Sequence, residues 1–252
     1  MGWGRYGVCE FCWSEAVRFR RAACDLCGRP RTAGPGRTCS GCAGARRVCS
    51  AVAAWGPYEG RLRGLVHALK YGARPRLARP LGEMILEALL AEGLEERLRG
   101  AVFVPVPLTR ERAAQRGYNQ ALLLAAEAAR ALRRMRGGRV RTVSALLRTG
   151  GTPQTGLTRK ERLRNLLGAF AAAPRSGRSV AGRQVVLIDD VITTGATVEA
   201  CSRAMRGIGA IDVIAGVVAR TPPPGYAPER AEESRGVGTS QGGLRERSRD
   251  MA

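Results

Sequence analysis

The 252-residue sequence is poor in lysine, histidine, aromatic residues and long apolar runs. Only two of its 42 basic residues are lysines, Lys70 and Lys160, and the single histidine is His67. Aromatic residues make up 5% of the chain, which limits the number of base-stacking platforms it can build. No apolar run approaches the roughly 20 residues that span a bilayer, and the N-terminus lacks the apolar stretch of a signal peptide. We therefore expect a cytoplasmic protein without membrane insertion.

Acidic residues are also scarce, at 21 against 42 basic ones, which leaves a formal net charge of +21. An excess of this size attracts phosphates and polyanions, so single-stranded DNA is an expected partner. A basic surface that is merely solvated, with its arginines reflecting coding bias, is the alternative. Hydrophobic residues make up 44% of the chain, which is enough for a core and excludes wholesale disorder.

Composition divides the chain into three parts. Residues 1–48 are rich in cysteine, arginine and glycine and lack hydrophobic periodicity, so a bound metal would have to organise them. Residues 49–220 alternate expected strands and helices. Residues 221–252 begin with TPPPG and stay polar, so we expect a disordered C-terminal tail.

The central part predicts an α/β fold, a parallel sheet with helices on both faces. Apolar runs at 101–109, 184–190 and 211–220 are typical of buried parallel strands, and shorter strands are expected near 50–57 and 142–147. Helices are expected at 61–72, 77–99, 121–135 and 197–209. In the first of these, the spacing of Leu62, Leu65, Val66 and Leu69 places four apolar residues on one face.

Six of the eight cysteines form three C-x-x-C pairs, Cys9/Cys12, Cys24/Cys27 and Cys39/Cys42. Nothing signals secretion, so a disulfide framework suits this chain less well than a metal site. Two C-x-x-C turns can together close a tetrahedral four-sulfur shell around Zn²⁺. The pattern therefore predicts structural zinc in the first part of the chain.

The stretch VVLIDDVITTGAT, residues 185–197, is the most informative in the sequence. Its apolar half predicts a buried strand with Asp189 and Asp190 at the carboxyl end, where α/β sheets bind ligands. The five residues TTGAT then open a helix. Small residues let backbone N–H groups approach an anion, and a helix N-terminus favours negative charge.

The two halves of this stretch suit different parts of one ligand. The acids would repel a phosphate, but they are strong acceptors for vicinal hydroxyls. We expect Asp189 and Asp190 to serve the sugar and the catalytic centre, and the loop to hold a 5′-phosphate, so the ligand is a ribose 5-phosphate. The loop residues are Thr193, Thr194, Gly195, Ala196 and Thr197. An ordinary strand-to-helix turn is the alternative, but a buried unpaired acid would be costly there.

This 13-residue pattern resembles the binding motif for phosphoribosyl diphosphate (PRPP) in type I phosphoribosyltransferases. Further stretches resemble the ComF family: LKYG at 69–72, VPVPL at 104–108, RGYNQ at 116–120, TPQ at 152–154 and the basic run at 159–165. The cysteine pairs agree as well. The resemblance covers residues 9 to 220. It implies a type I phosphoribosyltransferase-like domain behind a zinc ribbon, Mg²⁺ bound with PRPP, and a role in bacterial DNA uptake.

The resemblance also implies where the diphosphate would bind. A turn at 105–108 would contact it, and a flexible loop at 149–165 would close over it. Basic candidates for this contact are Lys70, Arg112, Arg116, Arg159, Lys160 and Arg162. Solvated helix faces, a plain basic loop or a nucleic-acid contact are the alternatives for these side chains.

Members of the family often carry a further C-x-x-C pair, which makes two sites of four cysteines each. This chain has three pairs. We therefore predict that Zn²⁺ is bound by Cys24, Cys27, Cys39 and Cys42, and that Cys9 and Cys12 form a second, partial site. Cys49 and Cys201 are expected to be buried thiols, with the role of a substitute metal ligand as the alternative for Cys49.

Three functions fit these residues. The first is a ComF-like DNA-uptake protein that binds PRPP and single-stranded DNA and contacts other uptake proteins. The second is an active transferase that moves ribose 5-phosphate from PRPP to an unknown acceptor, with residues 49–100 as the candidate for the hood element that would build an acceptor pocket. The third is a nucleotide-sensing regulator. No nucleophile–base pair stands out, but phosphoribosyl transfer depends on positioning, magnesium and stabilisation of the leaving group instead.

Overall fold

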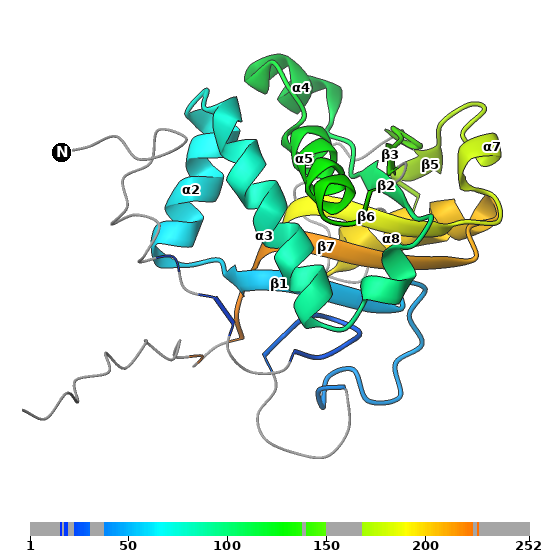
Figure 1. The fold of residues 1–252 in the computed structure, drawn as a ribbon, viewed down its shortest axis with the longest axis horizontal. Coiled ribbons are helices and arrows are strands. Elements are labelled where there is room, and N and C mark those ends of the chain that lie inside the picture. Colours follow the sequence, from blue (N-terminus) through cyan, green and yellow to red (C-terminus); the bar gives the residue numbers. More distant parts are fainter. Residues whose placement is uncertain are drawn as a thin grey trace, which may run out of the picture.

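The computed structural model describes residues 16, 18–19, 23–30, 38–137, 140–149, 168–223 and 226. Five strands form a parallel sheet in the order β1–β7–β6–β2–β3 (Figure 1). They are β1 (Ala51–Pro57), β2 (Val102–Pro105), β3 (Arg141–Thr142), β6 (Gln184–Ile192) and β7 (Asp212–Arg220). A separate antiparallel pair consists of β4 (Leu146–Arg148) and β5 (Phe170–Ala172). The three longest strands are mostly alanine, valine and isoleucine, as expected of strands buried on both faces.

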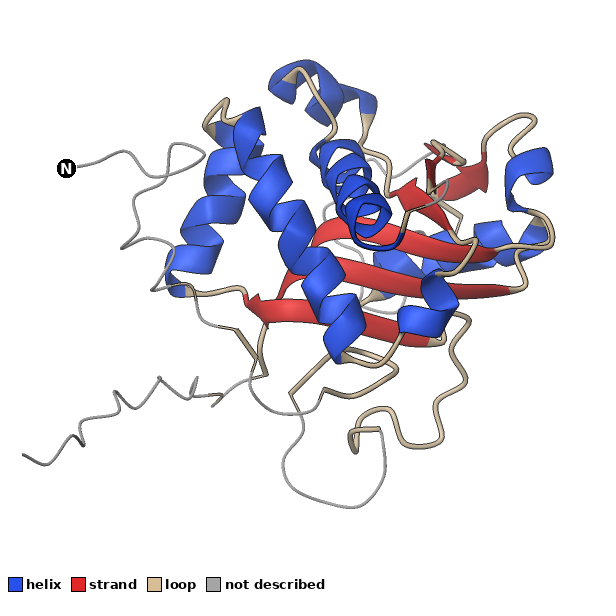
Figure 2. Ribbon diagram, in the orientation of Figure 1, coloured by secondary structure: helices blue, strands red, loops and turns tan. Residues whose placement is uncertain are grey.

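Helices cover both faces of the sheet (Figure 2). One face carries α2 (Gly60–Tyr71), α3 (Ala78–Ala91) and α5 (Gln120–Arg136), whereas α8 (Ala196–Gly207) and the β4–β5 pair pack on the other. The short elements are η2 (Pro75–Leu77), η3 (Glu95–Leu98), α4 (Arg110–Arg116) and α7 (Gly177–Val180). Each face has its own apolar core, so the molecule has three layers.

Two glycines allow α3 to pack tightly against its neighbours. A Cβ on Gly82 would lie 2.7 Å from the Cβ of Glu127 on α5. A Cβ on Gly216 of β7 would lie 2.7 Å from Cγ2 of Ile85. Both distances are shorter than real carbon contacts, so these positions require glycine for α3 to sit close to both the sheet and α5.

Most of the expected elements are confirmed, with differences at their ends. The helix expected over 77–99 is wrong beyond Ala91: Gly93 adopts φ +70°, in the left-handed region, and the separate turn η3 follows. The single strand expected near 142–147 is two strands, β3 and β4, which belong to different sheets. The expected tail lies outside the described residues, except for 221–223 and Tyr226.

The N-terminal segment, which we define as the described part of residues 16–50, covers the outer edge of β1. The backbone N–H of Val52 donates to the carbonyl of Asp25 at 2.7 Å, and the N–H of Phe19 donates to the carbonyl of Trp55 at 3.0 Å. An uncovered edge strand would offer these groups to another chain. In the part of the chain that is described, no helix combines the length and hydropathy of a membrane span.

Candidate phosphate site and metal centre

The two acids of the motif point to opposite faces of β6. Along the strand, Val186 and Ile188 belong to the core beneath α3 and α5, whereas Val185 and Leu187 belong to the core beneath α8. Side chains alternate along a strand, so Asp190 lies on the α5 side and Asp189 on the α8 side. The adjacent carboxylates therefore meet different surroundings.

Asp190 is buried, with 3% of its surface exposed, and both of its carboxylate oxygens have a partner. Nζ of Lys70, near the end of α2, lies 2.8 Å from Oδ1. Nε2 of Gln120, the first residue of α5, donates to Oδ2 at 2.7 Å. The structure thus brings Lys70, which the sequence suggested for the diphosphate, to one of the acids of the motif. An ion pair with a further hydrogen bond satisfies this buried charge.

Asp189 has different electrostatics. Its Oδ1 accepts a hydrogen bond from the backbone N–H of Asp190 at 2.8 Å. Burial among neighbouring atoms and then the charge of Asp190 raise the pKa of Asp189 to about 7. The hydrogen bond from Asp190 and the charges of Lys70 and Arg116 have the opposite, smaller effect. An approaching cation would favour the charged form of this carboxyl.

The turn between β6 and α8 has the geometry expected of a phosphate loop. Thr193 and Thr194 are exposed, and Gly195 adopts φ +86° immediately before the first residue of α8. Oγ1 of Thr194 accepts a hydrogen bond from the N–H of Ala196 at 3.3 Å. Thr197 is half-buried in the first turn of the helix. The first N–H groups of a helix lack partners within it, so they can serve an anion at this turn.

The RGYNQ stretch ties α2 and α5 to the carboxyl edge of the sheet. The hydroxyl of Tyr118 donates to the carbonyl of Leu69, and Nδ2 of Asn119 donates to the carbonyl of Val106 at 3.2 Å. Oδ1 of Asn119 caps α5 by accepting from the N–H of Ala121 at 2.9 Å. Together with Gln120, these bonds hold the start of α5 against the acidic pair.

Arg116 and Tyr71 form an exposed pair on the same rim. Nη2 of Arg116 donates to the hydroxyl of Tyr71 at 3.0 Å, and the guanidinium carbon lies 4.7 Å from the centre of the tyrosine ring. His67 lies against the same ring, with 4.7 Å between the ring centres. Tyr71 is 62% exposed. A flat, cation-backed ring of this kind is suited to stacking on a base.

Arg148, at the end of β4, is a partly buried arginine that the sequence analysis did not single out. Burial lowers its pKa, and Arg112 acts in the same direction, whereas Cys201, Asp189 and Glu111 oppose them. Its guanidinium also lies 5.3 Å from the centre of the Phe170 ring. The charges of Asp189 and Arg112 thus both act on Arg148, but nothing in its basic stretch of sequence distinguished it from its neighbours.

The other basic candidates divide into two groups. Arg112 and Arg116 lie on α4, and Arg112 is exposed. Arg159, Lys160 and Arg162 lie outside the described residues, as do Cys9 and Cys12. A contact between the 149–165 loop and a diphosphate therefore stays a prediction.

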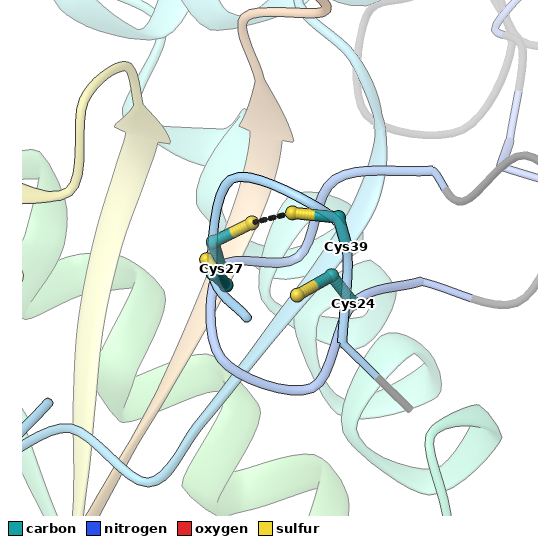
Figure 3. Close-up of side chains that lie close together, drawn as sticks. Cys24, Cys27 and Cys39 are labelled. Atoms are coloured by element: carbon teal, nitrogen blue, oxygen red, sulfur yellow. Dashed lines mark hydrogen bonds between the residues drawn. The ribbon is translucent and has the colours of Figure 1, made fainter. Parts of the chain in front are cut away.

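The sulfurs of Cys24, Cys27, Cys39 and Cys42 all lie within 4.8 Å of one another. Figure 3 shows the side chains of Cys24, Cys27 and Cys39 converging, with 3.7 Å between the sulfurs of Cys27 and Cys39. A tetrahedral ion with Zn–S bonds of about 2.3 Å requires about 3.8 Å between sulfurs. The cluster therefore fits a metal ion such as zinc.

Local turns hold these four cysteines in place. The N–H of Gly28 donates to the carbonyl of Cys24 at 2.7 Å, and the N–H of Ala43 donates to that of Cys39 at 3.0 Å. Burial raises the pKa of the Cys27 thiol to about 12, so a thiolate there needs a bound cation. Cys49 and Cys201 are buried outside the cluster, as expected, and the Cys49 thiol donates to the carbonyl of Ala51 at 3.2 Å.

A hollow of about 460 Å³ lies at the other end of the sheet, beside the start of β2. Its lining includes Leu98, Leu132 and Arg136. Parallel α/β sheets bind ligands at the carboxyl ends of their strands, and this hollow is at the amino ends. Arg136 is moreover paired with Glu95. We therefore assign the site to the opposite edge.

A parallel sheet whose central strand carries two acids at its carboxyl end and then opens through TTGAT onto a helix defines a phosphoribosyltransferase-type domain. A family model described as phosphoribosyl transferase domain matches residues 119–240. The site built from β6, α5 and α8 lies within that match.

Relatives extend the likeness to most of the chain. DNA utilization protein YhgH of Escherichia coli is 32% identical over 223 residues, which cover 86% of this chain and 92% of that protein. Competence protein F of Haemophilus influenzae is 29% identical over 208 residues, 82% of this chain and 87% of the relative. Orotate phosphoribosyltransferase of a Nocardioides species is 51% identical over 47 residues, 18% of this chain and 26% of that enzyme. The chain belongs to the ComF family of DNA utilization and competence proteins, which confirms the resemblance seen in the sequence.

Proposed function

We propose that this protein binds PRPP with Mg²⁺ at the turn between β6 and α8 and acts in the cytoplasm on incoming single-stranded DNA. The observation that carries the first half is the placement of Asp189 near the carboxyl end of β6, which leads into a loop where Gly195 takes a left-handed conformation before α8 begins. The names of two relatives that match more than four fifths of the chain, a DNA utilization protein and a competence protein, support the second half.

Within this proposal, the residues have separate roles. Asp189 accepts from the ribose hydroxyls or binds Mg²⁺, which prefers carboxylate and phosphate oxygens. Asp190 braces the site through its bonds to Lys70 and Gln120. The loop 193–197 holds the 5′-phosphate. The diphosphate is met by Arg112 and Arg148 and, once the loop closes, by Arg159, Lys160 and Arg162.

The metal bound by Cys24, Cys27, Cys39 and Cys42 is structural Zn²⁺ in this proposal. Residues 1–48 then form a zinc module and residues 49–220 the phosphoribosyltransferase-like domain. Four thiolates leave no open position for a substrate, so the ion organises the segment and takes no part in the chemistry. A cytoplasmic location suits this assignment because thiols stay reduced there.

The DNA-binding surface that we propose lies at the rim of the same site. Tyr71, backed by Arg116, offers a stacking face. Arg74 and Arg76, which follow the end of α2, are exposed and add positive charge. The same ring would also suit an acceptor base, which makes an active phosphoribosyltransferase the second candidate. Release of diphosphate from Mg-PRPP in the presence of candidate bases distinguishes the two.

The experiment that tests PRPP binding is calorimetry with Mg-PRPP on the parent protein and on Gly195→Val. Valine disfavours a φ of +86°, so the loop must rearrange and the Kd for PRPP should rise more than tenfold. The matched control is Gly64→Val, because Gly64 is exposed on α2 and a Cβ there meets no atom within 4 Å.

The proposal requires that ribose 5-phosphate compete with PRPP better than inorganic phosphate does. It also requires that Gly64→Val bind like the parent. If Gly195→Val keeps its circular dichroism spectrum and binds Mg-PRPP as tightly as the parent, the loop is not the phosphate site.

A further inference from the structure

Arg220, the last residue of β7, is buried in the molecule with 1% of its surface exposed. Its Nε and Nη1 are both buried and have no hydrogen-bond partner among the described residues. A guanidinium is always charged, and leaving such a charge buried and unpaired is strongly destabilising. The site of Arg220 therefore calls for a negatively charged partner.

The surroundings of Arg220 are mainly apolar, and the charges of two further arginines act on it. Arg220 lines a small cavity together with Cys27, Arg47 and Glu199. Burial lowers the pKa of Arg220, and the charges of Arg29 and Arg47 lower it further. The nearby thiols of Cys27 and Cys42 raise it. The Nε atoms of Arg29 and Arg47 are also buried without a partner among the described residues.

The carboxylate in this cavity is already engaged. Glu199 accepts from the backbone N–H of Val48 at 3.1 and 3.2 Å and from Nη2 of Arg203 at 3.1 Å. The centre of a water molecule can occupy only about 10 Å³ of the cavity, so a phosphate does not fit. Among the described residues around this cavity, the remaining source of negative charge is the cysteine cluster itself.

A zinc ion bound by four thiolates carries a net charge of −2, because each thiolate contributes one negative charge. We propose that Arg220 stabilises the metal-bound form of the four-cysteine cluster by donating hydrogen bonds to its thiolate sulfurs, assisted by Arg47. Thus the last strand of the sheet supplies part of a metal centre whose ligands all come from the N-terminal segment. Mutation of groups that hydrogen-bond to metal ligands in this way typically lowers the metal affinity by about 10- to 100-fold.

The same contacts join the metal centre to the start of α8. A Cβ on Gly195 would lie 3.5 Å from Nη1 of Arg47. Glu199, in the first turn of α8, accepts the N–H groups of both Val48 and Cys49. Residues 47–49 therefore lie between the cysteine cluster and the helix, so loss of the metal should increase hydrogen exchange at the start of α8.

The test compares Arg220→Met with the parent in the zinc-loaded and metal-free full-length proteins. Methionine keeps an extended apolar side chain without the charge. We expect the zinc affinity, measured by competition with a chromogenic chelator, to fall at least tenfold. We also expect opposite effects on stability, with a lower melting temperature for the zinc-loaded variant and an unchanged or higher one for the metal-free variant.

The matched control is Arg97→Met. Arg97 is partly buried and pairs with Asp212, the first residue of β7, at the far end of the same strand. This variant should lose stability equally with and without zinc and keep the zinc affinity of the parent. An Arg220→Met protein that folds and binds zinc like the parent overturns the proposal, as does equal destabilisation with and without zinc.

A second pair of variants covers the case in which Arg220→Met does not fold. Arg47→Gln alters a half-buried arginine of the same group, and Arg46→Gln alters its exposed neighbour. Arg47→Gln should weaken zinc binding several-fold and increase exchange at residues 196–203, whereas Arg46→Gln should do neither. Equal zinc affinities in these two variants also overturn the proposal.

Discussion

Lys70 and Asp190 form an ion pair across the carboxyl edge of the sheet, with 2.8 Å between Nζ and Oδ1. Their side chains are 16% and 5% exposed, and the amide of Gln120 takes the other carboxylate oxygen. The pair fixes the end of α2, and with it Tyr71, relative to the strand that carries the acidic motif. A residue of the LKYG stretch thereby sets the geometry of a site that lies on β6.

Removing one partner of this pair should destabilise the fold. Lys70→Met leaves the Asp190 carboxylate buried with only Gln120 as a partner, so we expect the free energy of unfolding to fall by about 3 kcal/mol. Urea denaturation measures the loss. The double variant Lys70→Met/Asp190→Leu should recover part of it, because no unpaired charge remains.

An exposed ion pair provides the control. Arg99 pairs with Glu96, and their side chains are 68% and 73% exposed. Arg99→Met should therefore cost less than about 1 kcal/mol. Equal losses in Lys70→Met and Arg99→Met would show that the Lys70–Asp190 pair contributes no more to stability than an exposed pair does.

Asp189 should make the stability of the protein depend on pH. Its pKa is about 7 in the folded chain and 3.8 as a free side chain, because burial and Asp190 disfavour its charged form. The folded state then holds a proton that the unfolded state has lost, so this residue lowers stability as pH rises from about 4 to 7. Above that range its contribution is constant.

Asp189→Asn should remove this slope. The measurement is the free energy of unfolding in urea at pH 5 and pH 7, where the parent should lose more stability than the variant. Asp212→Asn is the control. Burial raises the pKa of Asp212, but hydrogen bonds from Ser50, Gln184 and Arg97 together outweigh it, so the pKa is lowered and not raised as in Asp189. If Asp189→Asn shows the same slope as the parent, the Asp189 carboxyl of the parent does not change its protonation on folding in this pH range.

Local patterns predicted the parts of the site that local sequence determines. The strand, the acids and the TTGAT turn follow one another within 13 residues, so their relative placement follows from the direction of the chain. The same holds for the two C-x-x-C turns that make up the cysteine cluster. The helix at 77–99 was predicted too long because apolar periodicity continues past Gly93, whose left-handed conformation ends the helix.

The partners of these groups could not be predicted in the same way. Lys70 and Gln120 reach the acidic motif from two different helices, and no spacing in the sequence reports such contacts. Arg220 ends an apolar strand, where an arginine is expected to reach solvent, yet it is buried beneath the N-terminal segment. These roles depend on contacts between residues that lie far apart in the sequence, and such contacts leave no local motif in a single sequence.

The cysteine cluster predicts a defined metal content. Purified protein should contain zinc, and Cys24→Ser should lose about one equivalent of it, because three thiolates bind the ion much more weakly than four. The variant should also melt at a lower temperature, since the N-terminal segment covers the edge of β1. Atomic emission measures the metal and calorimetry the melting.

Cys201→Ser is the matched control for the zinc content. Cys201 is fully buried in α8 but lies outside the cluster. This variant should keep its zinc even if its core packing suffers. Full zinc occupancy in a Cys24→Ser/Cys39→Ser double variant would show that the ion is bound elsewhere.

Single-stranded DNA binding should depend steeply on salt. With a formal net charge of +21, the protein should release counterions on binding, and the logarithm of the binding constant should fall by about 0.7 per contacted phosphate for each tenfold rise in salt. Arg74→Glu/Arg76→Glu changes two exposed arginines beside the end of α2, so it should weaken binding and flatten this slope. Fluorescence anisotropy over a series of salt concentrations measures both quantities.

The control for this variant must change the net charge equally. Arg175→Glu/Arg178→Glu does so at the opposite edge of the sheet, where both arginines are exposed beside the start of β6. It should lower the affinity only modestly and leave the slope nearly unchanged, because a distant charge acts through a screened field and displaces no counterion at the contact.

Tyr71→Leu should instead weaken binding without altering the slope, since base stacking releases no counterions. Equal effects of the two double variants would mean that DNA responds to net charge alone and that the rim around Tyr71 is not the binding surface.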